Sequence, residues 1–291
     1  MFVKRSATVV IIALALLMVV AGGASAQLVG SIKDVIEPTG SSGKVDWTTG
    51  VITAVGIGAP PAQPANAAQA RAMAERAAQV VAYRNLLEAV KGVRVDSTTT
   101  VENFMVSSDV VRTEVSGIIQ GAMVMDKKYM SDGSVEVTVG MRLTGALADA
   151  LIPKGLAPSS IAPMGTPGAA ATTPAMPGQL YTGLIIDARG LGVRPAMAPK
   201  IYNEDGKEVY GSAFINRDYA VREGMVGYLK DPAAAQANPR VTDKPLMVKA
   251  LKVAGDARVD TVISNADAAA LQSVSQNLSM LEKCRVIILV D

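Results

Sequence analysis

The chain contains no histidine and only one cysteine among its 291 residues. Without histidine, a Ser-His-Asp or Cys-His catalytic arrangement, a histidine-ligated zinc site and a histidine pH switch are all excluded. With a single cysteine, an internal disulfide and a multi-thiolate metal site are excluded too. Cys284 stands beside the apolar run 286–290, which predicts a buried structural thiol. We therefore predict no catalytic residue, no metal, no cofactor and no enzymatic activity.

Aromatic residues and net charge are also scarce. Aromatics make up 4% of the chain, which argues against stacking platforms for sugars or single-stranded nucleic acid. The 28 basic residues exceed the 26 acidic ones by two, and Lys4 and Arg5 account for that excess. Beyond residue 26 the chain is neutral and lacks the basic footprint of a nucleic-acid-binding protein.

Residues 1–26 have the pattern of a cleavable signal peptide. Lys4 and Arg5 form a short positive region, the apolar run 9–20 follows, and small residues precede Gln27. The apolar run is shorter than the roughly 20 residues that span a bilayer, although an uncleaved anchor remains the alternative. No cysteine stands at the cleavage point. We therefore predict a periplasmic protein with no lipid anchor, and leave outer-membrane association open.

Composition divides the rest of the chain, about 265 residues, into segments that suit two ordinary domains. Residues 27–43 end in a Gly/Ser-rich turn and are predicted to be a flexible N-terminus. Residues 44–152 form the first predicted domain and residues 180–291 the second. Between them, residues 153–179 carry six prolines and almost no charge, a composition typical of a semi-rigid linker.

The first domain is predicted to be α+β. Alternating apolar residues over 45–57 predict a bent strand pair broken near Gly50. A helix over 67–90 follows, with Asn66 as its N-cap and Gln69 completing a capping box. Its inward stripe is predicted to comprise Ala70, Met73, Ala77, Val80, Leu87 and Val90, interrupted at Arg84.

The remainder of this domain alternates between strands and helices. Gly92 is predicted to end the long helix in a left-handed cap, and the β-branched run 93–101 to form a strand. A helix over 108–119 is predicted to face inward through Val110, Val111, Val115 and Ile118. A hairpin over 122–143 turns at Asp132-Gly133, and residues 146–152 add a closing helical turn.

The second domain is predicted to be α+β as well. Strands are predicted at 180–187, 246–253 and 259–263, with a short hairpin at Asp205-Gly206. Ser264 or Asn265 caps a helix whose inward residues are Leu271, Val274, Leu278 and Leu281. The continuous apolar run 285–290 predicts a strand buried on both faces. Residues 211–245 receive no assignment. Each domain is thus expected to be an antiparallel or mixed sheet packed with helices.

Residues 44–145 resemble a known family. The stretch VDWTTGVITAVGIGAPP carries an A-x-G-x-G strand, the long helix carries Arg84-Asn85-Leu86 and ends at Gly92-Val93, and Gly117 to Ala122 precede the hairpin. This pattern resembles the LPP-twenty lipoprotein family and is similar to the N-terminal domain of flagellar assembly protein T. The resemblance implies an α+β domain in a cell-envelope protein, with a flagellar structure as one of the assemblies it implies.

Four residues are candidates for interaction or ligand binding. Trp47, at a strand start, is interpreted as a core or rim aromatic, with an interaction anchor as the alternative. Arg84 is expected to reach a backbone carbonyl or an acid on the sheet rather than a ligand. Asp187 and Arg189 straddle a strand end, where they form either a salt bridge that pins the loop or a fork for an anionic group.

These features favour a non-enzymatic assembly or scaffolding component of an envelope structure. Its partners are expected to be proteins that dock on edge strands, and a homo-oligomer is left open. The alternative is a periplasmic module that binds a small ligand through the loop Asp187–Gly192. An enzyme that relies on carboxylates or lysine is the third hypothesis.

Overall fold

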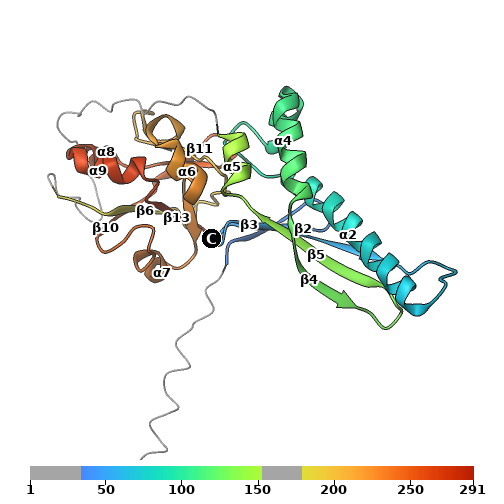
Figure 1. Ribbon diagram of the computed structural model, residues 1–291. Helices are drawn as coiled ribbons and strands as arrows, with labels where there is room; N and C mark the ends of the chain where they lie inside the picture. The colour runs from blue at the N-terminus through green and yellow to red at the C-terminus, as the bar shows by residue number, and fades with distance from the viewer. Residues whose placement is uncertain (1–33, 153–178) are drawn as a thin grey trace, which may run out of the picture. The chain divides into compact units, whose positions relative to one another are not determined.

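The computed structural model describes residues 34–152 and 179–291, here called the first and second lobes. The predicted signal peptide, the start of the predicted flexible segment and nearly all of the predicted linker lie outside these ranges. The first lobe contains one five-stranded sheet and the second lobe two four-stranded sheets, each accompanied by helices (Figure 1). The predicted α+β fold class, with antiparallel and mixed sheets packed with helices, is confirmed, and the second lobe adds a parallel sheet that the sequence does not predict.

The sheet of the first lobe is antiparallel throughout and has the order β1-β2-β3-β5-β4. The predicted strand pair broken near Gly50 and the predicted hairpin at Asp132-Gly133 both form. The strands are β1 (Ile36–Thr39), β2 (Gly43–Asp46), β3 (Val51–Gly58), β4 (Met123–Tyr129) and β5 (Val135–Arg142).

The prediction of a flexible segment up to residue 43 is wrong for its described part, because this part contains β1. Gly40 takes a φ of 59°, so the chain turns there and returns as β2. The Thr39 hydroxyl donates to the carbonyl of Ala89 at 3.1 Å, and the Trp47 amide donates to the carbonyl of Val35 at 2.8 Å. These bonds tie the strand to the rest of the lobe.

One long helix, α2 (Ala67–Lys91), covers one face of this sheet. Asn66 caps it as predicted, since its side-chain oxygen accepts from the Gln69 amide at 2.8 Å. The Gln69 side chain differs slightly from a capping box, because it accepts from the Ala65 amide and not from that of Asn66.

The predicted inward stripe of α2 is largely wrong. Only Val90 is common to the predicted stripe and the buried set, which is Ala74, Ala78, Ala82, Leu86, Ala89 and Val90, whereas Met73 and Val80 are 48% and 55% exposed. A Cβ added to Gly56 would lie 2.4 Å from the carbonyl oxygen of Ala78. The helix therefore touches the strand backbone itself, and the contacting turn accommodates only small side chains.

The predicted strand at 93–101 does not form either. The Asp96 carboxylate accepts from the amides of Thr98 and Thr99, each at 2.8 Å, and this Asx turn folds the run back on itself. Only an isolated bridge between Arg94 and Thr100 remains, and Val101 begins a helix. Gly92 also departs from its predicted left-handed cap, with a φ of −74°.

Three shorter helices complete the first lobe: α3 (Val101–Ser107), α4 (Asp109–Gln120) and α5 (Ala146–Leu151). Ser108 caps α4 as predicted, through a bond from the Val111 amide. The predicted inward face of α4 is confirmed at Val115, which is buried, and at Val111 and Ile118, which are partly buried against the core. It is wrong at Val110, which is exposed, and it omits Ile119, which is buried.

The second lobe is built on a parallel sheet of order β10-β6-β13-β9. Its strand β13 lies centrally with every residue buried, which confirms the prediction for the closing run. The strands are β6 (Gly183–Asp187), β9 (Gly227–Leu229), β10 (Pro245–Lys249) and β13 (Val286–Leu289). A mixed side sheet contains β7 (Ile201–Tyr202), β8 (Glu208–Tyr210), β11 (Lys252–Ala254) and β12 (Asp260–Val262).

The helices of this lobe refine two predictions. The single helix predicted after Ser264 is a pair, α8 (Asn265–Gln272) and α9 (Ser275–Glu282), with Val274 as the N-cap of the second. The unassigned region 211–245 contains the 3₁₀ turn η1 (Ser212–Phe214), α6 (Arg217–Glu223), β9 and α7 (Pro232–Gln236).

The two lobes lie in one compact unit, Asp34–Asp291, and share a hydrophobic core. Backbone bonds cross between them, from Met197 to the carbonyl of Arg94 at 3.0 Å and from Gly145 to the carbonyl of Val221 at 2.7 Å. Arg217 also forms an ion pair with Asp149, with Nη1 and Oδ1 2.6 Å apart. The composition of the segment between the lobes does not predict this contact.

Candidate functional site

The loop Asp187–Gly192 follows β6, where the ends of the parallel strands meet. Arg189 donates from Nε and Nη2 to the two carboxylate oxygens of Asp187 at 2.8 and 2.7 Å, and this bonding lowers the pKa of Asp187. The amides of Gly190 and Gly192 donate to the carboxylate of Asp291. The structure thus contains the predicted salt bridge, and a ligand here would have to displace the chain's own carboxylates.

Arg84 lies exposed on α2 and forms no hydrogen bond or ion pair with any residue of the two described ranges. The expectation that it reaches a carbonyl or an acid on the sheet is therefore wrong. The reason is the shifted stripe of α2, because its buried face runs through Ala78, Ala82 and Leu86 and Arg84 does not interrupt it.

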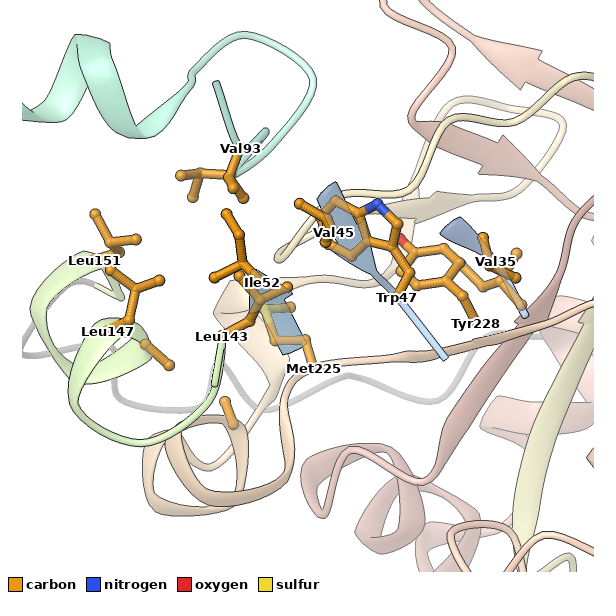
Figure 2. Close-up of a cluster of buried hydrophobic side chains, with 14 of the residues drawn as sticks. Val35, Val45, Trp47, Ile52, Val93, Leu143, Leu147, Leu151, Met225 and Tyr228 are labelled. Carbon is orange, nitrogen blue, oxygen red and sulfur yellow. The ribbon is translucent and has the colours of Figure 1, made fainter. Parts of the chain in front are cut away.

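Trp47 is buried at the contact between the lobes, with 6% of its surface exposed. Its ring meets that of Tyr228 edge to face at 5.7 Å, as Figure 2 shows, and its Nε1 donates to Glu37 Oε2 at 3.2 Å. The Tyr228 hydroxyl in turn donates to the carbonyl of Ala196 at 2.9 Å. Trp47 therefore occupies a core position, as predicted. The contact between the lobes in which it lies was not predicted.

A cleft of about 580 Å³ opens beside this aromatic pair, with walls from both lobes. Sequence reasoning missed it, because its residues come from five separate stretches that only the lobe contact brings together. They lie within residues 47–50, 142–152, 196–197, 219–240 and 283–287.

The charged residues of this cleft are almost all basic. They are Arg142, Arg222, Arg240, Lys283 and Arg285, with Glu223 as the one carboxylate. Glu223 is engaged by Arg222, whose Nε lies 3.2 Å from its Oε1. The remaining four cations have no ion pair within the described part of the chain, so the cleft carries a positive charge that the neutral composition does not suggest.

Arg240 is the most constrained of these cations. Its guanidinium donates to three backbone carbonyls, those of Glu223, Gly224 and Cys284, at the C-terminal ends of α6 and α9. Carbonyl oxygens orient the guanidinium without neutralising it, and burial lowers the pKa of Arg240. The adjacent Cys284 is buried as predicted, and burial raises its pKa to about 11, which makes it a neutral, unreactive thiol.

A second surface is the face of the first-lobe sheet opposite α2, together with the outer edge of β4. Residues Val51, Val55 and Ile57 of β3 lie on this face, since the alternate residues Ile52 and Ala54 are buried. At the sheet edge, Met123 and Met125 are 70% and 55% exposed. A register shift between Val124 and Asp126 distorts the strand at Met125.

The other face of β4 is tied to the helix. Lys127 forms an ion pair with Glu75 of α2, and the Tyr129 hydroxyl donates to the same carboxylate at 3.2 Å. No described strand pairs with the outer edge of β4. The strand is therefore paired with β5 along its inner edge and bonded to α2, while its outer edge offers free backbone donors and acceptors.

The described residues provide neither a cluster of metal ligands nor a membrane-spanning helix. Residues 34–152 and 179–291 contain no group of three or more Cys, Asp or Glu that could hold a metal ion. Within the same ranges, no helix has the length and apolar character needed to cross a membrane.

Comparison with known proteins divides the chain in the same way as the lobes. Residues 47–142 match the family model of the LPP20 lipoprotein, which agrees with the resemblance inferred for the first lobe. Residues 183–291 match the model of the second domain of Treponema pallidum Tp0624. No curated protein matches the chain.

Proposed function

We propose that this protein is exported to the periplasm and acts there as a non-enzymatic assembly or scaffolding component of a cell-envelope structure. The match of residues 47–142 to the LPP20 lipoprotein model supports an envelope-associated protein. The pattern of residues 1–26 supports export. The resemblance of residues 44–145 to flagellar assembly protein T makes a flagellar structure one form of this proposal.

The observation that carries the proposal is the free edge of β4. An extended segment of a partner can pair with such an edge, so that main-chain hydrogen bonds provide affinity and alternate side chains provide specificity. Met123 and Met125 lie beside this edge, and methionine side chains adapt well to the surface of a partner. The occupant we propose is therefore a strand of another envelope protein with apolar residues at alternate positions.

The ion pair between Lys127 and Glu75 supports this choice of edge. It joins β4 to α2, and β4 is already paired with β5 along its inner edge, so little of the strand has to be ordered on binding. Charged side chains on β4 also disfavour nonspecific pairing of its edge with other strands. They are those of Asp126, Lys127 and Lys128.

Photo-crosslinking in cells tests this assignment. We expect a photoreactive residue in place of Met123 to give one discrete crosslinked protein in the envelope fraction. The matched control is Val106 on α3, which is 73% exposed but lies on a different element.

In a Met123→Lys/Met125→Lys variant, a photoreactive residue placed at Ile57 is expected to give no crosslinked product. The melting temperature of this variant should stay close to that of the wild type, since both methionines are exposed. The proposal fails if Met123 gives no product, or if Val106 gives the same product. A deletion strain with normal motility would exclude the flagellar form alone.

A further inference from the structure

We infer that the basic cleft between the lobes binds an anionic amphiphile, a molecule with a phosphate or carboxylate head and a short apolar body. This site is separate from the β4 edge and does not depend on the proposed docking function. It also differs from the loop Asp187–Gly192, whose donors are occupied by Asp187 and Asp291.

The charge of the cleft selects an anion. Four of its five cations have no carboxylate partner in the described ranges, and Glu223 is engaged by Arg222. In a chain whose acidic and basic residues nearly balance, a concentration of one sign within one concave surface focuses the field on a ligand of the opposite sign. Arg142 and Lys283 are exposed there and come from opposite lobes.

Arg240 provides a fixed positive group at the same place. Its bonds to the carbonyls of Gly224 and Cys284, at 3.1 and 2.8 Å, hold the guanidinium without an anion. These bonds and that to Glu223 occupy both Nη1 hydrogens and one Nη2 hydrogen, so Arg240 contributes a fixed positive charge, which needs no reordering when an anion binds.

The rest of the lining selects an apolar body. Met197, Tyr219 and Val226 line the cleft as partly buried apolar side chains, and the lining also includes the almost fully buried rings of Trp47 and Tyr228, which Figure 2 shows at the lobe contact. The volume of about 580 Å³ lies in the range of roughly 300–1,000 Å³ that ligand sites occupy. The combination of fixed cations with aromatic and aliphatic walls fits an amphiphile better than a bare inorganic ion.

Trp47 makes the test direct, because it is the single tryptophan of the chain and lines the cleft. Octyl phosphate, kept below its micelle concentration, is expected to change Trp47 fluorescence saturably and to raise the melting temperature. Octanol and inorganic phosphate, the two halves of this probe, are each expected to bind at least about tenfold more weakly.

The variant Arg142→Gln/Lys283→Gln removes one exposed cation from each lobe. We expect it to weaken octyl phosphate binding about tenfold or more, with the melting temperature of the free protein unchanged. Arg84→Gln is the matched control, because Arg84 is an exposed, unpaired cation on α2, and it should bind as the wild type does.

The inference is overturned if octyl phosphate gives no saturable change, or if octanol binds equally well. It is also overturned if the double variant binds with wild-type affinity. Vesicles of phosphatidylglycerol, with phosphatidylcholine vesicles for comparison, then identify the source of the anion. Sedimentation with the former that is lost in the double variant supports a lipid headgroup, and octyl phosphate binding without sedimentation supports a free ligand.

Discussion

At the scale of single residues, glycine and alanine decide the packing of the first lobe. Gly56 and Gly58 of β3 allow the backbone of α2 to approach so closely that a Cβ at Gly58 would lie 2.2 Å from the carbonyl oxygen of Ala74. Helical spacing predicts a buried face that includes Met73 and Val80, but the short contact distance requires the alanines of a neighbouring face, Ala74, Ala78 and Ala82. The excluded side chains, Met73 and Val80, are left at the surface.

This contact predicts the effect of Gly56→Ala. The added methyl group would lie 2.2 Å from the backbone nitrogen of Ala82, so the helix has to shift, and we expect unfolding to become easier by about 1–3 kcal/mol. Urea denaturation measures this change.

The control for this variant is Gly117→Ala. Gly117 lies in α4 with open space around its Cβ position, and alanine there should stabilise the protein by about 0.5–1 kcal/mol. Equal effects of the two substitutions would show that α2 does not pack closely on β3.

At the scale of elements, the sequence predicted what local chemistry determines. The cap at Asn66, the cap at Ser108 and the turn at Asp132-Gly133 all formed, because each depends on residues within a few positions. The central burial of β13 was also predicted, since a continuous apolar run requires cover on both faces.

The elements that were predicted wrongly depend on contacts that the local pattern of apolar and polar residues does not predict. The run 93–101 has the composition of a strand, but the Asp96 carboxylate binds the next two amides along the turn and ends the extended run. Likewise the Gly/Ser-rich composition predicts a flexible segment where β1 forms, because the pairing of β1 with β2 depends on the turn at Gly40 and on a long-range bond to α2. Of the four candidate site residues, only Asp187 and Arg189 contact each other, through their ion pair.

At the scale of the whole molecule, the lobe contact is the feature that sequence reasoning missed. A proline-rich segment between two domain-like sequences usually indicates independent bodies. Here residues 47 and 228 meet in a shared core, and the basic cleft exists only because of that contact.

The contact predicts that the two lobes unfold together. Trp47 reports on the lobe contact and circular dichroism on the helices and strands, so the two signals should change at the same urea concentration. Tyr228→Ala removes the ring beside Trp47 and should lower the common midpoint by the equivalent of about 3–5 kcal/mol. A change in Trp47 fluorescence well before the loss of secondary structure would show that the lobes separate first.

Pairing of a partner strand with the outer edge of β4 can be measured by amide hydrogen exchange. Exchange rates would be measured for the purified protein alone and for its complex with the partner that crosslinks to Met123. We predict slower exchange over residues 123–129, because their outward amides gain hydrogen-bond partners, with little change over α3. Unchanged exchange in β4, or protection confined to another element, would contradict the proposed pairing.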